Sequence, residues 1–202
     1  MSRMHYYPDS NSEAGQESFV LNMLDELYDR YYLEIGAFES KKTSNTYMLE
    51  KDFYWKGIAL EILPECVLEY NTNRKNPCFQ ADATTFDYKK CLDGAQAPRR
   101  IDYLQLDIEP ASQTLAALKQ VPLDDYRFSV ITFEHDLYYA PENRQVKAEA
   151  IEILKSHGYV LAVENVKVDA PGWPLREFED WWVDPEVVPA EKYKDLKLRY
   201  MS

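Results

Sequence analysis

The chain has 202 residues, enough for one domain with a sizeable core and too few for two comfortable ones. Hydrophobic residues make up 46% and charged residues 29%, values typical of globular rather than disordered proteins. The formal net charge of -12 argues against a nucleic-acid partner, because affinity for phosphates comes from lysine and arginine.

Cysteine usage and hydropathy indicate the compartment. Three cysteines, an odd number without a CxxC pair, are typical of reduced intracellular thiols rather than of a disulfide framework or a zinc site. The start lacks the apolar core of a signal peptide, and no stretch approaches the roughly 18 apolar residues of a membrane span. We expect a cytoplasmic protein with a single domain over residues 1–202, of which residues 1–11 lie outside the ordered fold.

Helices and strands alternate through the first half of the chain. The first helix carries apolar residues at spacings of three and four, among them Phe19, Met23 and Leu27. Pro64 occupies the first turn of a later helix, where proline is favoured. In chain order the predicted elements are helix 12–28, strand 31–36, helix 44–51, strand 57–62, helix 64–73 and a weak strand 77–80.

The second half continues the alternation and then departs from it. The predicted elements are strand 101–107, helix 111–118, strand 128–133, helix 143–156, strand 159–163 and strand 178–183. Repeated strand–helix–strand units predict a parallel sheet with helices on both faces. The last two strands have only a loop between them, with Pro171, Gly172 and Pro174, and predict an antiparallel pair. The expected fold is a Rossmann-like, doubly wound α/β fold with a mostly parallel seven-stranded sheet, its last strand antiparallel.

Acidic residues follow the predicted strands where a ligand would bind. In an open α/β sheet, ligands bind beyond the carboxyl ends of the strands, at the switch in strand order. A single carboxylate at a strand end is more often a solvated loop residue or a helix cap, but a series at one edge predicts a site. The series here is Glu34, Glu61, Asp82, Asp107 with Glu109, and Glu134 with His135 and Asp136.

These positions match the needs of a nucleoside cofactor. Gly36 lets the backbone approach a ligand closely at the end of the first strand. Glu61 is placed to accept hydrogen bonds from both ribose hydroxyls, and Asp82 with Ala83 to read the adenine edge. The first loop has one glycine rather than GxGxxG, so no pyrophosphate cradle is evident. The sequence therefore favours S-adenosylmethionine, which has no phosphate, over NAD.

Short motifs in a specific order run along most of the chain. They are GQE at 15–17, LEIGAF at 33–38, SNT at 44–46, LEK at 49–51, WKG at 55–57, ALE at 59–61, ADA at 81–83, IDYLQLDIE at 101–109, FEHD at 133–136 and FEDWWV at 178–183. In this order and spacing the chain resembles the FkbM-type methyltransferase family. The resemblance implies a seven-stranded sheet and methyl transfer from S-adenosylmethionine, usually to an oxygen acceptor such as a sugar hydroxyl.

The resemblance also implies residue roles. Glu34 and Gly36 would line the methionine and ribose of the cofactor, while Asp107 and Glu109 would face its methyl group. Pro110 stands where the family often has glycine, and a further glycine of the first loop is missing, which leaves the loop shape open. The predicted cofactor-binding set is Glu34, Gly36, Ala37, Glu61, Ile62, Asp82, Ala83 and Asp107.

The predicted catalytic residues are Asp107, Glu109 and His135. Methyl transfer is a direct displacement, so the site must align the acceptor and remove one proton. His135 is the candidate general base, because an unperturbed histidine has a pKa of about 6.5. The alternative is a structural histidine that forms hydrogen bonds within its loop.

A divalent metal is a competing hypothesis for the same strand ends. Five side chains from neighbouring strands could converge on a hard cation, although their local spacing is no metal signature. They are Asp107, Glu109, Glu134, His135 and Asp136.

Aromatic residues flank the predicted site. Tyr138 and Tyr139 are expected to border the acceptor pocket. Trp181 and Trp182 could stack on a sugar, but such a pair more often places one ring in the core and one at its rim.

The sequence predicts a methyltransferase for a sugar or other small hydroxyl acceptor, with a small molecule or glycan as partner. Two alternatives remain: a nucleotide-sugar or dinucleotide enzyme of similar fold, and a non-catalytic nucleoside-binding module.

Overall fold

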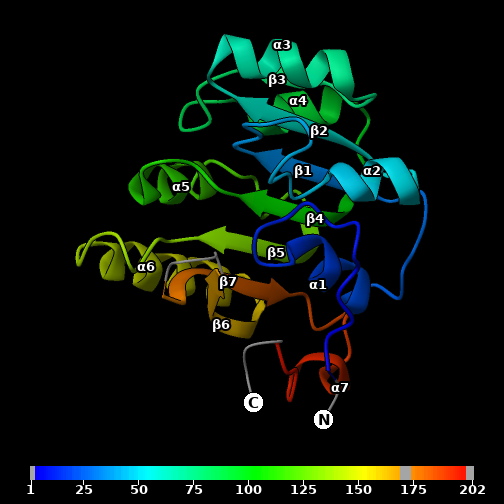
Figure 1. Cartoon of the computed structure of the whole chain (residues 1–202). Coiled ribbons are helices and arrows are strands. Elements are labelled where there is room, and N and C mark those ends of the chain that lie inside the picture. The colour runs from blue at the N-terminus through cyan, green and yellow to red at the C-terminus, as the bar shows by residue number, and fades with distance from the viewer. Residues whose placement is uncertain (1–2, 169–173, 199–202) are drawn as a thin grey trace.

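Seven strands form one sheet in the order β3-β2-β1-β4-β5-β7-β6 (Figure 1). The computed structural model describes residues 3–168 and 174–198. Neighbours among the first five strands run parallel, and β7 runs antiparallel to both β5 and β6. The predicted doubly wound sheet with its antiparallel last strand is therefore confirmed. The strands are β1 (Tyr31–Ile35), β2 (Lys56–Glu61), β3 (Cys78–Gln80), β4 (Arg100–Leu106), β5 (Arg127–Glu134), β6 (Val160–Val168) and β7 (Arg176–Val183).

The helices follow the predicted positions with three differences. The first is shorter than expected, because Gly15 at its N-cap has φ 90° and Asp25 and Glu26 beyond its end have φ 55°. α4 and α7 were not predicted; Asp87 caps α4 by accepting a hydrogen bond from the Lys90 N–H. Within the described ranges, no helix has the length and apolar character needed to cross a membrane. The helices are α1 (Gln16–Met23), α2 (Tyr47–Phe53), α3 (Pro64–Asn73), α4 (Tyr88–Gly94), α5 (Ala111–Leu118), α6 (Asn143–Ser156) and α7 (Ala190–Tyr193).

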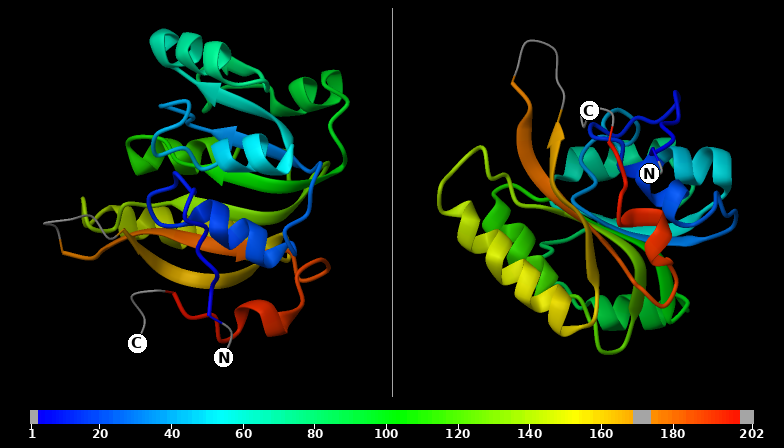
Figure 2. Two further views of the ribbon diagram at one scale, coloured as in Figure 1. Left: turned by 45° about the vertical axis from the view of Figure 1, so that its right-hand side comes forward. Right: turned by 90° about the horizontal axis from the view of Figure 1, so that it is seen from below.

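Helices cover both faces of the sheet (Figure 2). Successive strand side chains point to opposite faces, so Leu33 joins a core with α4, α5 and α6, while Tyr32 packs with α1, α2 and α7. Trp181 and Trp182 are both fully buried, on opposite faces of the sheet. The expectation of one ring at the rim is therefore wrong. The predicted loop residues Pro171 and Gly172 lie outside the described residues.

The first strand meets the fourth where the strand order switches. Gly36, just beyond β1, has φ +86°, and a Cβ atom there would lie 1.8 Å from the backbone oxygen of Asp107. The Asp107 N–H donates to the carbonyl of Ile35 at 3.0 Å. Glycine is thus required for the close approach of these two strand ends, which form the floor of the candidate site.

The N-terminal segment runs along the molecule instead of standing apart from it. Met4 is buried in the core beside α1, and Arg3 forms a bridge with Lys197. Ser12 forms a second bridge, with Thr43 in the loop after β1. Residues 3–11, which were expected outside the ordered fold, therefore pack against the domain and lead the chain to the site.

Candidate functional site

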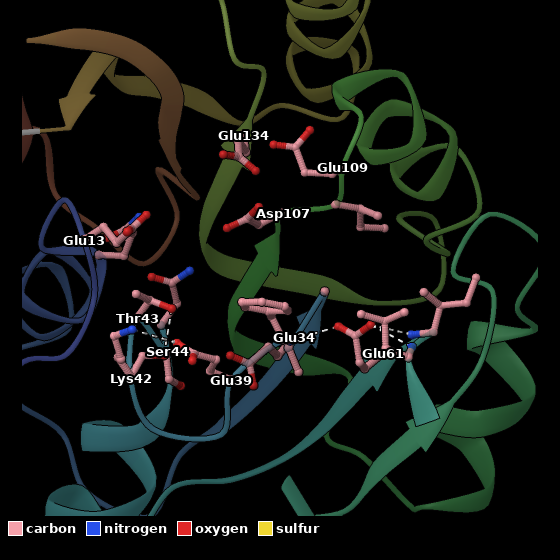
Figure 3. A pocket seen from close by; sticks show the side chains of 18 of the residues that line it. Glu13, Glu34, Glu39, Lys42, Thr43, Ser44, Glu61, Asp107, Glu109 and Glu134 are labelled. Carbon is pink, nitrogen blue, oxygen red and sulfur yellow. Dashed lines mark hydrogen bonds and ion pairs between the residues drawn. The ribbon is translucent and has the colours of Figure 1, made fainter. Parts of the chain in front are cut away.

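A cavity of about 700 Å³ opens at the carboxyl ends of β1, β2, β4 and β5 (Figure 3). We call it the main cavity. Carboxylates from several strand ends point into it, as Figure 3 shows for Glu34, Glu61 and Asp107. Of the predicted site residues, the structure brings together Glu34, Gly36, Ala37, Glu61, Ile62, Asp107 and Glu109.

Glu34 is buried at one side of this cavity. Its Oε2 accepts hydrogen bonds from the Thr46 hydroxyl at 2.8 Å and from the Tyr70 hydroxyl at 3.2 Å. Burial raises the pKa of Glu34 to about 7, while the charge of Arg74 and these hydrogen bonds act in the opposite direction. Glu34 thus links the cavity to the polar cluster behind it.

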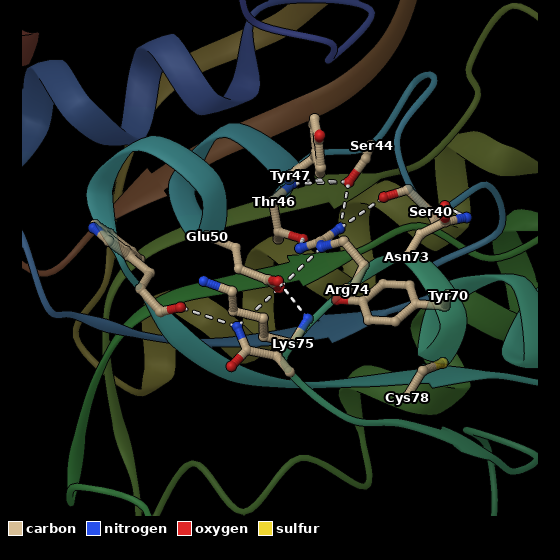
Figure 4. A network of polar contacts seen from close by, with 12 residues as sticks. Ser40, Ser44, Thr46, Tyr47, Glu50, Tyr70, Asn73, Arg74, Lys75 and Cys78 are labelled. Carbon is tan, nitrogen blue, oxygen red and sulfur yellow. Dashed lines mark hydrogen bonds and ion pairs between the residues drawn. The ribbon is translucent and has the colours of Figure 1, made fainter.

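That cluster is centred on Arg74 at the end of α3 (Figure 4). Its Nε lies 2.9 Å from Oε2 of Glu50, and both side chains are almost entirely buried. The remaining guanidinium N–H groups donate to the Ser40 carbonyl, the Ser44 hydroxyl and the hydroxyls of Tyr32 and Thr46. One buried cation therefore ties the loop after β1 to α2 and α3, and holds that loop in shape beside the cavity.

The carboxylate of Glu61, at the end of β2, accepts hydrogen bonds from three backbone N–H groups. Its Oε1 accepts from the N–H groups of Ile62 at 2.8 Å and Leu63 at 2.9 Å, and its Oε2 from the N–H of Phe38 at 2.9 Å. A carboxylate oxygen has two lone pairs, so Oε2 keeps one acceptor position and Oε1 none. Glu61 therefore has one acceptor position free for a further hydrogen bond, and its predicted contact with ribose hydroxyls stays a prediction.

Apolar side chains line the same end of the cavity and remain exposed. Phe38 is 55% exposed, Ile62 57% and Leu63 40%. Exposed apolar groups around a concave site are typical of ligand-binding surfaces. They place an apolar platform beside Glu61.

The other end of the cavity holds Asp107, Glu109 and Glu134, which lie close together in Figure 3. Burial raises the pKa of Asp107, and the charge of Glu109 raises it further. Burial and the charge of Asp107 hold the pKa of Glu134 well above its usual range. Burial also raises the pKa of Glu109, together with the charge of Asp136. Mutual repulsion in a desolvated site favours protonation at this end.

Asp82 and Ala83 do not line the main cavity. The Asp82 carboxylate accepts from the N–H and the hydroxyl of Thr84, at 2.9 Å and 2.7 Å, and these hydrogen bonds lower its pKa. Ala83 is buried in the core, and its carbonyl accepts from the Tyr88 hydroxyl. One oxygen of Asp82 is thus engaged in a local turn, and the predicted adenine contact stays a prediction.

His135 is not among the residues that line the main cavity. Its ring is fully buried, with Nε2 3.3 Å from Oδ1 of Asp180 on β7. Glu134 and His135 are consecutive residues at the end of β5, so their side chains point in opposite directions. Glu134 lines the main cavity, whereas His135 lies beside Asp180 on β7. Neither ring nitrogen has a hydrogen-bond partner among the described residues, so the hydrogen bonds of the structural alternative are not formed here. A general base would need direct access to the acceptor.

Part of the cavity wall is formed by residues that were not predicted to belong to the site. Glu13 and Gln16 reach it from the N-terminal segment, and Lys42 and Thr43 from the loop after β1. Ser12 pairs with Thr43, which brings the two segments together. The GQE motif at 15–17 was the only signal that could have pointed there.

The two tyrosines after β5 line different cavities. Tyr138 lines the main cavity and stacks under the guanidinium of Arg176, whose Cζ lies 4.5 Å from the ring centroid. Tyr139 lines a second cavity of about 460 Å³ between the starts of α5 and α6, which we call the α5–α6 cavity. Glu109 lines both cavities and so marks their boundary.

The described residues do not form the set of ligands that the metal hypothesis requires. Across residues 3–168 and 174–198, no group of three or more His, Cys, Asp or Glu side chains is arranged to hold a metal ion. Of the five side chains considered, His135 in particular faces Asp180.

Solved structures of methyltransferases superpose on most of the chain. An rRNA methylase from Streptococcus thermophilus does so with a TM-score of 0.52 at 10% identity, over 83% of this chain and 93% of that one. The N-methyltransferase NodS from Bradyrhizobium japonicum WM9 gives 0.53 at 12% identity, over 84% and 94%. A precorrin-6y C5,15-methyltransferase from Geobacter metallireducens GS-15 gives 0.52 at 14% identity, over 89% and 94%.

No protein-family model matches the chain and no curated relative does, so the FkbM resemblance stays a prediction. At these low identities the structural likenesses concern the fold alone. Together with the strand order, they show that the chain has the Rossmann-like fold of class I methyltransferases.

Proposed function

We propose that this protein is an S-adenosylmethionine-dependent methyltransferase for a small acceptor. The observation that carries the proposal is the charge of the main cavity. Seven acidic residues line it, at positions 13, 34, 39, 61, 107, 109 and 134, whereas Lys42 is the basic residue among its described lining. S-adenosylmethionine combines an ammonium, a sulfonium and one carboxylate, so its net charge is positive. A dinucleotide brings a negatively charged pyrophosphate, which this cavity would repel.

The residues present fit the parts of this cofactor. Oε2 of Glu61 has one acceptor position left for a ribose hydroxyl. Ile62 and Phe38 provide the apolar surface on which an adenine ring can lie. Asp107, at the switch between β1 and β4, supplies negative charge for the ammonium and sulfonium groups.

The bound cofactor would supply a methyl group on a sulfonium: a carbon–oxygen bond to the acceptor forms, the carbon–sulfur bond breaks, and its electron pair remains on sulfur. The chain must then hold the acceptor in line and take up its hydroxyl proton. Glu109 stands at the boundary of the two cavities and is exposed to solvent. Its raised pKa makes it a better proton acceptor than an ordinary carboxylate, so we assign it the role of general base.

The acceptor class follows from the FkbM resemblance, which implies a sugar or other small hydroxyl compound. An RNA acceptor is unfavourable, because a net charge of -12 opposes association with phosphates. Cys66, Cys78 and Cys91 are free thiols, which fits the proposed cytoplasmic location.

Calorimetry tests the cofactor assignment. We expect S-adenosylmethionine and S-adenosylhomocysteine to bind the purified chain, and NAD to give no binding heat. Asp107→Asn should weaken cofactor binding about tenfold, since it removes one charge from a buried contact. Failure of both adenosyl compounds to bind would refute the proposal. If they bind but no labelled methyl group reaches any acceptor offered, the non-catalytic binding module would be favoured instead.

A further inference from the structure

Two buried carboxylate oxygens near the boundary of the cavities accept no hydrogen bond. They are Oε2 of Glu134 and Oδ1 of Asp136, and neither has a partner among the described residues. Glu134 is only 8% exposed and Asp136 only 2%. A buried carboxylate without a donor is costly, so the arrangement is one that a ligand would complete.

These two side chains face the two cavities. Glu134 lines the main cavity, where Figure 3 shows it beside Glu109. Asp136 lines the α5–α6 cavity, which Glu109 also borders. Asp136 is close enough to Glu109 and Glu134 for its charge to raise the pKa of both. A ligand that spans the boundary would therefore contact both residues.

Protein cations do not neutralise this group. Among the ion pairs of the described residues, none includes Asp107, Glu109, Glu134 or Asp136. Lys42, which lines the main cavity, lies 3.8 Å from Glu39. Negative charge that forms at the boundary is thus not balanced by an ion pair of the described residues, and a cationic ligand would favour the ionised carboxylates.

The cofactor accounts for part of that charge. A net charge of +1 on S-adenosylmethionine would be balanced by Asp107 alone, which lies on the cofactor side of the group. Oε2 of Glu134 and Oδ1 of Asp136 would then still lack donors. The acceptor, which must lie beyond the methyl group, is the next ligand able to provide them.

An organic ammonium suits these oxygens better than a metal ion does. A hard cation needs several oxygen ligands gathered within about 2.6 Å of one point, and the described residues contain no such group. An ammonium group carries up to three N–H donors, so it can bridge carboxylates that are further apart.

We propose that the acceptor is an amine-bearing molecule whose ammonium group binds Glu134 and Asp136, which brings its hydroxyl group to Glu109. This inference rests on the proposed methyltransferase function and adds to it the charge class of the acceptor. Amino sugars and amino alcohols have this chemistry, whereas neutral sugars lack the ammonium group.

Binding of matched probes to the full chain, saturated with S-adenosylhomocysteine, tests the inference by calorimetry. The probe pairs are glucosamine with N-acetylglucosamine, and 4-amino-1-butanol with 1,4-butanediol. We expect each amine to bind about tenfold tighter than its neutral partner. Asp136→Asn and Glu134→Gln should each remove about tenfold of that preference. Glu152→Gln, on an exposed position of α6, makes the same charge change outside the cavities and should leave it intact.

Each outcome has a defined meaning. Failure of S-adenosylhomocysteine to bind would refute the proposed function before the acceptor is reached. If it binds while the neutral probes bind as well as the amines, or no amine binds, the inference is overturned and the cofactor assignment survives. Binding of Mg²⁺ that is lost in Glu134→Gln and excludes the amines would also overturn it, in favour of a metal. Asp136 has φ 48°, which asparagine tolerates, so Asp136→Asn is the variant expected to fold without strain.

Discussion

The two ends of the main cavity use carboxylates in opposite ways. At the end formed by β1 and β2, Glu34 and Glu61 accept hydrogen bonds from hydroxyl and backbone N–H groups of the chain itself. At the end formed by β4 and β5, Glu134 and Asp136 each keep an oxygen without a donor. Both ends are acidic and largely buried, but among the described residues only the second has buried carboxylate oxygens without any donor.

The difference separates carboxylates that organise the protein from carboxylates that await a ligand. A carboxylate with its donors in place stabilises the fold, and its removal leaves those donors unpaired. A carboxylate without donors destabilises the fold until a ligand arrives. Substitutions of Glu61 and of Glu134 should therefore change stability with opposite signs.

The largest effect is expected from the cation that completes the first end. Arg74→Met should lower the free energy of unfolding by about 3–5 kcal/mol, because it leaves buried Glu50 and Glu34 without their counter-charge. Urea denaturation measures this. The control Arg144→Met, on an exposed position of α6, should stay within about 0.5 kcal/mol of the unchanged protein. Equal losses in the two variants would contradict a stabilising role for the Arg74 cluster.

The pH dependence of stability should reveal the buried acids. Burial raises the pKa of Glu17 and Glu34 from 4.5 to about 7. Between these values the unfolded chain releases protons that the folded chain retains, so stability falls as pH rises from 4.5 to 7. Each group should contribute on the order of 3 kcal/mol. Urea midpoints between about pH 5 and 8 measure the slope, and Glu34→Gln should flatten it; a slope of opposite sign would refute the assignment.

Loss of the partnered carboxylate at the end of β2 should be destabilising. Glu61→Gln replaces one acceptor oxygen by an amide NH₂ that opposes a backbone N–H, of Phe38 or of Ile62 and Leu63. We expect the free energy of unfolding to fall by about 2 kcal/mol in thermal or chemical denaturation. Unchanged stability would mean that these N–H groups do not depend on the charge of Glu61.

Replacing a carboxylate that has an oxygen without a donor should raise the free energy of unfolding instead of lowering it. In Glu134→Gln the new amide can donate to Asp107, so the free energy of unfolding at pH 8 should rise by about 1 kcal/mol. Denaturation beside the Glu152→Gln control measures the gain. A loss as large as that of Glu61→Gln would abolish the distinction between the two ends.

The sheet and the strand ends could be predicted because they depend on local patterns. Alternating apolar segments such as 101–107 identify the strands, and the carboxyl-end rule then brings Glu34, Glu61 and Asp107 to one edge. The position of β7 between β5 and β6 determines that His135 meets Asp180. No local signal carries that information, so His135 could not be separated from Glu134 by sequence.

The remaining errors also arise from contacts that sequence spacing does not encode. Oδ1 of Asp82 accepts from Thr84, two residues on, in a turn that was not predicted. Arg74 and Glu50 are 24 residues apart, and their contact depends on how α2 and α3 pack. The Arg74 cluster was missed for this reason.

Glu17 gives the N-terminal segment a role in assembling the site. It accepts hydrogen bonds from the Ser10 hydroxyl, the Asn11 N–H and the Met48 N–H, and so joins the segment to α2. Glu13 and Gln16 of the same segment line the main cavity. Cofactor binding and attachment of this segment are consequently linked equilibria: whatever releases residues 10–17 opens the cavity wall, and an occupied cavity protects the segment from proteolysis.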